Sequence, residues 1–512
     1  MKTSLPCIFV AVLFLAFVSA CSNVGSISRS NTQSGPPPPS GPPAPPPPPV
    51  QSVITECGTS ISSPGTYTLN SSLDTQGGDE PCITIANAKD ITLNCNGNSI
   101  TGVGEFGVSV SNVSSFVLEN CTVNTGKGDG LSALLALNNV SGGTITGSTF
   151  GSGQSDLGGV LIIGCTNVTL GSQLPSAPTN PSITAATNPS ISDQISNAPE
   201  PSNLIYGYID AANNVNLVIE GNALTSGTST ALNSFMIGIF GGENTRVVNN
   251  SVNGLGNPIP VTENGIDSYD SVGTDDDILI EDETGPGSLV SGNLLVNTWD
   301  CGIETVGFMK NMTLSNNRID MVGTSIGGWY YVSVTGVQYT QNVSTNIEYA
   351  GVFYARHGGL RAAGKQLPFF AYRIPADMPA ETTVNFTQNQ FTGNTFSQPI
   401  TVTQNEVGAL IAEVYSRMLY TAESSLLPGT EPTPQQFLTV NNTFTNNSFT
   451  GAFDQIGFGG SPPWTYTSDD VIDGGGNICS GSLSYVPSVS PTFGDTTVAI
   501  IPIHSINCGN GN

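Results

Sequence analysis

The chain has 512 residues, of which 12 are Lys or Arg and 38 are Asp or Glu, so its formal net charge is −26. A charge of this sign argues against a nucleic-acid partner, which needs a positive surface, and against adsorption to anionic lipid. Only 10% of the residues are charged, but 38% are hydrophobic and occur in short runs, so the composition is not that of a disordered protein. The abundance of Gly, Asn, Thr, Val and Ile favours β structure.

Residues 1–20 are predicted to be an export signal. An unbroken apolar run extends from Cys7 to Val18, which is shorter than the roughly 20 residues of a membrane span but suits a secretory signal. The motif Val-Ser-Ala-Cys that follows resembles the bacterial lipoprotein box. This resemblance implies that Cys21 is lipidated and holds the exported protein at the bacterial outer membrane or cell surface. Ordinary cleavage after Ala20, with a secreted product, is the alternative.

Residues 21–52 are predicted to be a tether. Eleven prolines lie between positions 36 and 49, and such a stretch adopts an extended polyproline II conformation of about 3.1 Å per residue. A lipid followed by a stiff spacer would hold a folded domain away from a membrane, which the chain then contacts through its N-terminal lipid only. A ligand for a proline-recognition domain is the alternative.

From residue 53 to residue 480 the chain repeats a loose pattern of a short alternating strand, Asn or Gly, and a second short strand. Examples are DITLNCNGNSITG at 90–102, SFVLENCTVNTG at 115–126 and NMTLSNNRIDMVG at 311–323. Where no insertion intervenes the spacing is about 24 to 30 residues, a period that indicates a solenoid. Asn and Gly suit the bends because they tolerate left-handed backbone angles, and stacked Asn side chains can hydrogen-bond from turn to turn.

The opening of this region, CGTSISSPGTYTLNSSLDTQGGDEPCITIANAKDITLNCNGNSITG, resembles bacterial right-handed parallel β-helix proteins of the pectin-lyase-like superfamily. The resemblance implies an all-β fold, a right-handed parallel β-helix solenoid with inserted loops over 53–480, followed by a C-terminal cap over 481–512. An antiparallel β-sandwich array is the alternative. The resemblance says little about function, because this scaffold hosts lyases, hydrolases, epimerases, adhesins and phage spikes.

Three segments interrupt the repeats. Residues 172–203 and 421–436 are rich in Pro, Ser and other loop-forming residues and are predicted to be loops that leave the coil. Residues 405–419 place their apolar side chains on one helical face, which predicts a short helix, although a strand fits nearly as well.

Eight cysteines follow Cys21, an even number that is compatible with disulfides in an exported chain. The preferred bridges are those that bracket a short segment at one end of the folded region. They join Cys57 with Cys82, and Cys479 with Cys508.

An acidic segment, residues 263–283, contains nine carboxylates and lies in a stretch without Lys or Arg. Carboxylate oxygens are the ligands that Ca²⁺ takes in sixes to eights, and a divalent cation relieves the repulsion between close carboxylates. A solvated acidic loop is the alternative. The segment predicts a calcium site with the candidate ligands Asp270, Asp275, Asp276, Asp277 and Glu281.

A basic segment, residues 354–375, concentrates cations in a chain that has few. Arg binds carboxylates in a bidentate manner and aromatic rings offer flat faces to sugars, so the segment predicts an acidic polysaccharide, or a host or envelope surface glycan, as the partner. The alternative is a basic loop that only pairs with the acidic segment, three turns and roughly 15 Å away. Catalysis is assigned to His357, Arg361 and Lys365, and substrate binding to Tyr354, Arg356, Tyr372 and Arg373.

The resemblance implies two enzyme mechanisms. Pectate lyases use Ca²⁺ to neutralise a uronate carboxylate and Arg or Lys as the base, and the acidic and basic segments contain these parts. The polygalacturonase motifs are incomplete, because no Asn-Thr-Asp occurs and Asp277 lies too far before His357. We therefore predict a lipid-anchored envelope protein that binds an acidic polysaccharide, with Ca²⁺-dependent β-elimination as its lyase-like activity. A non-catalytic surface adhesin or structural protein is the alternative.

Overall fold

The computed structural model divides the chain into two units, residues 1–48 and 49–512, and every described residue lies in the second unit. None of the described residues forms a helix, so none of them forms a helix long and apolar enough to cross a membrane. The structure describes residues 50–74, 80–102, 106–125, 132–151, 158–172, 201–225, 233–254, 274–284, 287–298, 301–329, 331–356, 384–397, 419–423, 437–450, 457–460, 471–480, 492–493, 496–497 and 499–502.

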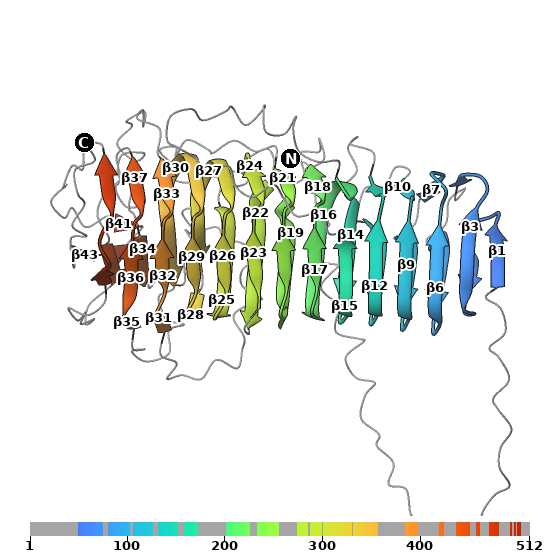
Figure 1. Cartoon of the computed structure of the whole chain (residues 1–512), viewed down its shortest axis with the longest axis horizontal. Coiled ribbons are helices and arrows are strands. Elements are labelled where there is room, and N and C mark those ends of the chain that lie inside the picture. Colours follow the sequence, from blue (N-terminus) through green and yellow to red (C-terminus); the bar gives the residue numbers. More distant parts are fainter. Residues whose placement is uncertain are drawn as a thin grey trace, which may run out of the picture. The chain divides into compact units, whose positions relative to one another are not determined.

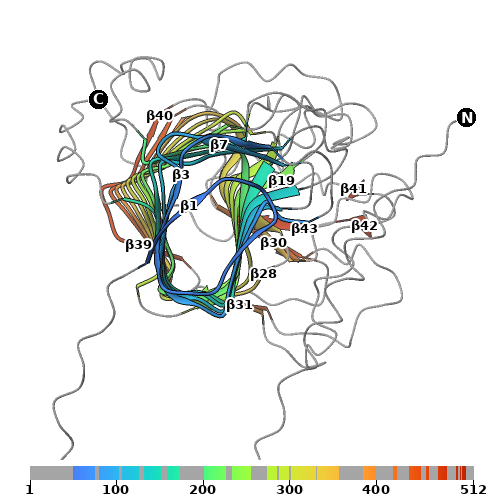
Figure 2. The same cartoon turned by 90° about the vertical axis from the view of Figure 1, so that its right-hand side faces the viewer.

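The strands form the parallel β-helix that the sequence predicts. Most strands pair in parallel with strands one turn before and one turn after them, so β3 (Gly65–Leu69) lies between β1 (Val50–Ile54) and β6 (Lys89–Asn94). Figure 1 shows the resulting stack of turns, which begins at β1. In Figure 2 the β1 end faces the viewer, and the chain passes clockwise from the sheet of β3 through that of β7 (Ser99–Gly102) to that of β19 (Asn233–Glu243) as it recedes. The coil is therefore right-handed.

Three sheets run along the coil. The long-strand sheet contains β2 (Thr59–Ile61), β5 (Ile83–Ala86), β8 (Phe106–Ser111), β11 (Ser132–Asn138), β14 (Gly158–Ile163), β16 (Asn203–Val215), β19, β22 (Thr274–Thr284), β25 (Cys301–Lys310), β27 (Arg318–Trp329), β30 (Val343–Arg356), β34 (Leu419–Glu423), β38 (Gly457–Gly460) and the antiparallel β43 (Ala499–Pro502).

The second sheet contains β1, β3, β6, β9 (Ser114–Glu119), β12 (Ser141–Thr146), β15 (Thr166–Gly171), β17 (Val218–Glu220), β20 (Arg246–Val248), β23 (Leu289–Ser291), β26 (Thr313–Ser315), β29 (Gln338–Thr340), β32 (Gln390–Thr392), β36 (Asn442–Thr445) and β39 (Val471–Asp473).

The third sheet contains the first residues of β16, β27 and β30 together with β4 (Leu73–Asp74), β7, β10 (Thr122–Thr125), β13 (Ser148–Phe150), β18 (Ala223–Thr225), β21 (Ser251–Asn253), β24 (Leu294–Val296), β33 (Thr395–Ser397), β37 (Ser448–Thr450) and β40 (Ile478–Ser480). β28 (Tyr331–Thr335) pairs with the last residues of β25, and β31 (Val384–Thr387) and β35 (Phe437–Val440) pair in succession after it. β41 (Thr492–Phe493) and β42 (Thr496–Thr497) form a separate antiparallel pair.

The interior of the coil is filled by stacks of apolar side chains, because alternate residues of each strand point inward. Equivalent residues of successive turns lie directly above one another. The rings of Tyr339, Phe391 and Phe444 show this most clearly, with centroids 4.4 Å apart at both steps and nearly parallel planes. Each of these rings is fully buried. The stacks hold the turns in register, since a slip by one residue would expose every ring.

The turns explain why Asn recurs in the sequence. Of the 21 non-glycine residues with positive φ in the described part of the chain, most are asparagines, and they stand at equivalent positions of successive turns. Asn249, between the second and third sheets, has a φ of 56°, and the next turn has Gly292 at the same place. A Cβ on Gly292 would lie 2.5 Å from Asn249 Oδ1, so the glycine also makes room for the amide below it. The prediction of left-handed Asn at the bends is confirmed.

A ladder of buried asparagines follows these turns inside the coil. Asn293 Nδ2 donates to Asn317 Oδ1 and to the carbonyl oxygen of Val247, both at 2.9 Å, and Asn293 Oδ1 accepts the backbone N–H of Asn250 at 2.9 Å. One side chain thus forms hydrogen bonds with polar groups of three turns. These groups would be costly to bury without a partner. The ladder consists of Asn203, Asn222, Asn250, Asn293, Asn317, Asn342, Asn394, Asn447 and Asn477.

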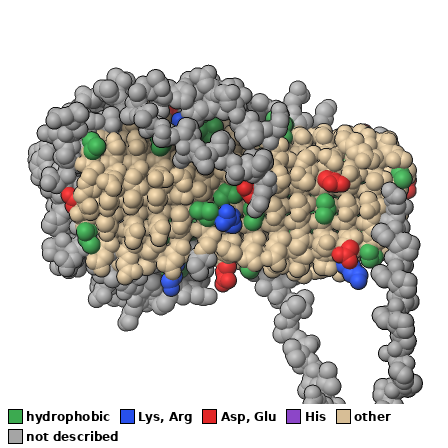
Figure 3. All heavy atoms as spheres, viewed as in Figure 1, with side chains coloured by type: hydrophobic (Ala, Val, Ile, Leu, Met, Phe, Trp, Pro, Cys, Tyr) green, Lys and Arg blue, Asp and Glu red, His purple; other side chains and the backbone are tan. Residues whose placement is uncertain are grey.

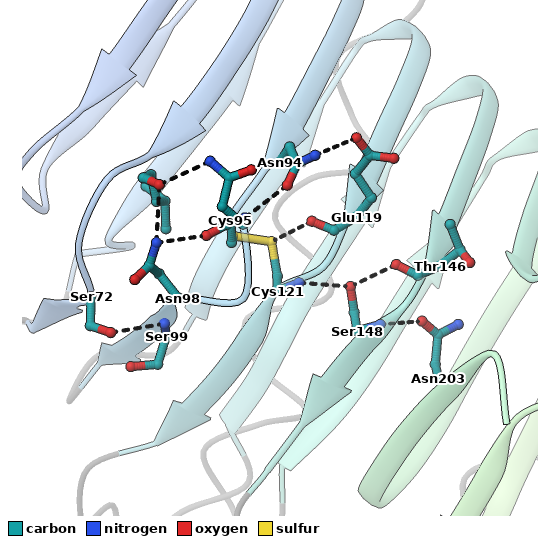
Figure 4. The surroundings of a disulfide bond; sticks show 12 residues. Ser72, Asn94, Cys95, Asn98, Ser99, Glu119, Cys121, Thr146, Ser148 and Asn203 are labelled. Atoms are coloured by element: carbon teal, nitrogen blue, oxygen red, sulfur yellow. Dashed lines mark hydrogen bonds between the residues drawn. A yellow bond between two sulfur atoms is a disulfide. The ribbon is translucent and has the colours of Figure 1, made fainter. Parts of the chain in front are cut away.

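Toward the N-terminal end a disulfide takes over from the ladder (Figure 4). Asn203 Oδ1 accepts the backbone N–H of Ser148, and Ser148 Oγ accepts the backbone N–H of Cys121 at 3.3 Å. Cys121 is joined to Cys95 one turn earlier. The same interior position is therefore occupied by amides, a hydroxyl and finally a covalent bond.

The predicted bridge between Cys57 and Cys82 is present, whereas the bridge between Cys95 and Cys121 was not predicted. Both link successive turns and are separated by 25 and 26 residues in the chain. Cys479 lies on β40, but Cys508 falls outside the described residues, so that bridge stays a prediction.

Three predicted boundaries differ from the structure. The first strand begins at Val50, inside the predicted tether, because Val50 to Ile54 pair with β3. The acidic segment is not entirely a loop, since β22 takes up Thr274 to Thr284 and buries Asp276 and Asp277. β34 includes the first residues of the loop predicted at 421–436. The helix predicted over 405–419 lies outside the described residues except for its last residue.

Candidate functional site

The outer surfaces of the sheets differ in chemistry. The view in Figure 3 shows the outer surface of the second sheet, which is covered mainly by uncharged polar side chains and backbone. The strands of the long-strand sheet change in length along the coil. In the first five turns β2, β5, β8, β11 and β14 have 3 to 7 residues, whereas the strands of the next six turns, from β16 to β30, have 10 to 14. We call the outer surface that these six strands form within the long-strand sheet the long-strand face.

The inward column of the long strands defines which side chains belong to this face. Ile209, Ile237, Ile278 and Ile303 are paired in succession and are fully buried in the core. The residues that follow them point outward, since side chains alternate along a strand. That outward column consists of Asp210, Gly238, Leu279 and Glu304, of which Leu279 and Glu304 are only 8% and 5% exposed.

Three aromatic rings form a cluster at the start of the long-strand face. Phe235 lies between Tyr208 and Phe240, with ring centroids 6.3 Å and 5.2 Å away and edge-to-face orientations. Gly238 is required here, because a Cβ on it would lie 2.5 Å from a ring carbon of Phe235 and 2.7 Å from one of Phe240. The rings therefore close over the glycine, in the edge-to-face geometry that aromatic pairs prefer.

Carboxylates accompany the rings. Glu281 is paired with Phe240, and Glu304 is paired with Leu279, two residues before Glu281. Glu281 and Glu304 are therefore diagonal neighbours, about 7 to 8 Å apart at the backbone. Asp210 occupies the outward column two turns before Leu279. The face combines apolar rings with a row of acidic side chains.

The phenol of Tyr208 stays protonated in this setting. Burial, and then the nearby charge of Asp210, raise its pKa to about 12. A neutral phenol next to a carboxylate can donate its proton in a hydrogen bond and accept another. The ring thus offers both an apolar face and a polar edge.

Only part of the predicted catalytic segment can be placed. Tyr354 and Arg356 lie at the end of β30, where Tyr354 pairs with Gly328 and Arg356 pairs with Glu423. β30 stands three turns after β22, which agrees with the predicted separation of the basic and acidic segments. The other predicted residues, His357, Arg361, Lys365, Tyr372 and Arg373, lie outside the described residues, so their roles stay predictions.

The predicted calcium ligands do not converge within the part of the chain that the structure describes. There, no three His, Cys, Asp or Glu side chains are grouped so that they could hold a metal ion. Asp276 accepts the backbone N–H of Cys301 at 3.2 Å, while both carboxylate oxygens of the fully buried Asp277 have no hydrogen-bond partner. Asp270 lies outside the described residues, as does the side chain of Asp275. Calcium binding therefore remains a prediction.

Sequence reasoning missed the aromatic cluster and the carboxylates Asp210 and Glu304. Their signal was weak, because Tyr208, Phe240 and Glu304 are scattered over about a hundred residues and only the pairing of β16, β19, β22 and β25 brings them together. Within β16 the burial of side chains alternates without a break over residues 203–211.

Comparison with known proteins gives matches of structure only. The sequence matches no protein-family model and no curated protein. Among solved structures, the chain is similar to the A-module of a mannuronan C-5 epimerase of Azotobacter vinelandii, with 11% identity over 82% of this chain and 91% of that chain and a TM-score of 0.33.

A tailspike protein of the E. coli bacteriophage HK620, in complex with a pentasaccharide, shows 10% identity over 82% of this chain and 61% of that chain, with a TM-score of 0.32. The surface protein and adhesin PfbA of Streptococcus pneumoniae shows 13% identity over 82% and 90%, with a TM-score of 0.24. The right-handed parallel β-helix itself rests on the strand pairing of this chain.

Proposed function

We propose that this protein binds a polysaccharide along the long-strand face. The observation that carries the proposal is the combination, on one outer surface, of the ring cluster of Tyr208, Phe235 and Phe240 with the half-buried carboxylates Asp210 and Glu281. Binding sites for small molecules typically combine apolar and aromatic side chains with a few placed polar groups. Successive turns stand about 4.8 Å apart, so equivalent groups recur along the coil as sugar units recur along a glycan.

We further propose that the glycan is acidic and that basic residues near the end of β30 hold its carboxylates. The described part of the face carries negative charge, which by itself repels a polyuronate. Arg356, which lies on β30, and the predicted binding residues after it would supply the opposite charge. Bound Ca²⁺ would reduce the repulsion in the same way.

The lyase activity is a finer part of this proposal. In β-elimination a base removes the proton next to the uronate carboxylate, and the bond to the leaving sugar breaks. We assign the base to Arg361 or Lys365, with His357 beside them, and assign Ca²⁺ to the neutralisation of the substrate carboxylate. If this chemistry is absent, the same face makes the protein a non-catalytic adhesin.

Location completes the proposal. We infer that the export signal directs the chain out of the cytoplasm and that lipid on Cys21 anchors it at the outer membrane or cell surface. Release of the protein from washed membranes by a Cys21→Ala substitution tests this directly. A protein that stays membrane-bound after the substitution would contradict the anchor.

The test of function measures binding and product together. Purified protein is incubated with polyuronates and neutral polysaccharides, with Ca²⁺ or a chelator, and unsaturated products are followed by ultraviolet absorbance. We expect Phe240→Ala to weaken binding about tenfold, since stacking on a ring is worth about 1 to 3 kcal/mol. Gln338→Ala, an exposed change on the second sheet, is the matched control. Equal binding by both variants would contradict a site on the long-strand face.

The ultraviolet absorbance of unsaturated products distinguishes a lyase from a non-catalytic glycan-binding protein. Calcium-dependent product that disappears in Arg361→Ala and Lys365→Ala would establish the lyase. Binding without product in any condition would leave a non-catalytic glycan-binding protein.

A further inference from the structure

Met321 adopts a backbone conformation that its side chain disfavours. Its φ is 55°, and every other non-glycine residue of positive φ in the described part of the chain is Asn, Asp, Ser or Gln. Left-handed angles cost a residue with an ordinary side chain of this length on the order of 1 to 3 kcal/mol. A strained residue that persists marks a place where some other requirement outweighs the strain.

The position of Met321 shows what would relieve this strain. It lies opposite Asn297 on the turn before and Asn346 on the turn after, since Val296 pairs with Asp320 and Asp320 pairs with Thr345. Both asparagines have the same left-handed backbone, with φ of 65° and 51°. An asparagine at 321 would therefore continue an existing column. The chain instead presents an apolar side chain that is 40% exposed.

Charged groups stand next to this methionine. Ile319 is buried in the core, so its neighbours Arg318 and Asp320 lie on the outer side of the third sheet, where Asp320 is nevertheless only 8% exposed. Asp320 Oδ1 accepts two hydrogen bonds, from Thr345 Oγ1 at 2.5 Å and from Asn346 Nδ2 at 2.7 Å. Both bonds go to one oxygen, which fixes the carboxylate beside Arg318.

Arg318 is half-buried between the turns that precede and follow it. It pairs with Leu294 on the turn before and with Val343 on the turn after. Neither of these side chains has an atom that can accept a hydrogen bond from the guanidinium of Arg318. Burial lowers the pKa of Arg318 and the charge of Asp320 raises it. The guanidinium remains charged, because an unperturbed Arg titrates near pH 12.5 or above.

The corner that carries these groups is also free of long insertions. β27 and β30 run continuously from the third sheet into the long-strand sheet, whereas 20 residues separate β21 from β22 and 21 residues separate β33 from β34. Met321 therefore lies where the third sheet passes directly into the long-strand face.

We propose that this corner is a binding subsite for a hexuronate unit of the glycan, in which Arg318 binds the sugar carboxylate and Met321 contacts the apolar face of the ring. The subsite rests on the polysaccharide-binding function proposed above, and it extends the binding surface beyond the long-strand face to a second sheet. The guanidinium fork suits a carboxylate.

The test uses the purified protein with uronate oligosaccharides and with the same oligosaccharides after chemical reduction of their carboxylates. We expect Arg318→Gln to weaken binding of the uronate form about tenfold or more, and to leave binding of the reduced form unchanged. Arg246→Gln, which removes an exposed charge from the second sheet, is the matched control and should change neither.

Met321→Asn supplies the second readout. We expect its thermal midpoint to rise by about 1 to 3 °C, because the strain is relieved, while its affinity for the uronate form falls several-fold. A variant that is more stable and binds less well separates loss of a contact from loss of fold.

The outcomes distinguish the subsite from the function on which it rests. Equal binding by the wild-type protein, Arg318→Gln and Met321→Asn, together with weaker binding by Phe240→Ala, would overturn the subsite and leave the function standing. Equal losses in Arg318→Gln and Arg246→Gln would also overturn it, because the effect would then be one of net charge. If the wild-type protein binds no polysaccharide, the proposed function fails and the subsite fails with it.

Discussion

The interior column at the turn between the second and third sheets is built differently in two regions of the coil. From Asn203 onward each turn places an asparagine there, and each amide bonds to the next. In the earlier turns the same column holds Ser148, Cys121 and Cys95. The backbone groups to be satisfied are alike in both regions. The comparison shows that one geometric requirement can be met by a hydrogen-bonded ladder or by a covalent link, although only the link depends on an oxidising compartment.

The largest expected effect comes from removing the link. A Cys95→Ala/Cys121→Ala variant should lose about 3 kcal/mol of unfolding free energy, because the disulfide closes a loop of 26 residues. The measurement is chemical unfolding followed by circular dichroism. Adding asparagine in its place, as Cys95→Ala/Cys121→Asn, should recover part of the loss by extending the ladder to Ser148. No difference between these two variants would show that the regions are not equivalent.

Breaking the ladder itself should cost somewhat less. Asn317→Leu removes the donor to the carbonyl oxygen of Val290 and the acceptor for the backbone N–H and Nδ2 of Asn293. We expect a loss of about 2 to 3 kcal/mol, since buried polar groups are left unpaired. Asn311→Gly, at an exposed bend, is the matched control and should change stability by less than about 0.5 kcal/mol, because glycine accepts the same left-handed backbone. Similar losses in both variants would argue against the ladder as the source of stability.

Asp277 is a buried polar group that is stabilised neither by the asparagine ladder nor by a disulfide. Burial raises its pKa well above the usual value, and its carboxylate oxygens have no hydrogen-bond partner. The folded state therefore binds a proton that the unfolded state releases, so the contribution of this carboxyl to stability is most favourable at acidic pH. It should fall by at most about 1.4 kcal/mol per pH unit as the pH rises from the ordinary carboxyl pKa toward the raised one.

Asp277→Asn should remove this slope, and unfolding measured as a function of pH with and without the substitution checks it. Glu243→Gln, on the preceding strand of the same sheet, is a control that should keep the wild-type slope. A wild-type stability that rises over this pH range would contradict the assignment.

The sequence was sufficient to predict the fold for a simple physical reason. A coil of short strands needs apolar residues at alternate positions and left-handed residues at each bend, and both requirements appear as a local pattern around residues such as Asn249 and Asn316. The pairing of Cys57 with Cys82 followed from their position at one end of the repeats. The bridge between Cys95 and Cys121 did not, because no local feature distinguishes those cysteines from Cys165, which is buried without a disulfide.

The candidate surfaces depend on the register between strands of successive turns. That register cannot be read from the sequence of a single repeat. Sequence alone identified charge clusters as sites, yet the pairing of β19, β22 and β25 decided that Asp277 is buried and that Glu281 and Glu304 become neighbours. The pairing of β24, β27 and β30 likewise places Met321 between two left-handed asparagines. Only this placement shows that Met321 departs from the residue type that occupies the column. Local periodicity thus determined the coil, because each turn obeys the same rules. Tertiary structure decided the surface, because residues far apart in the chain meet there only when the turns stack.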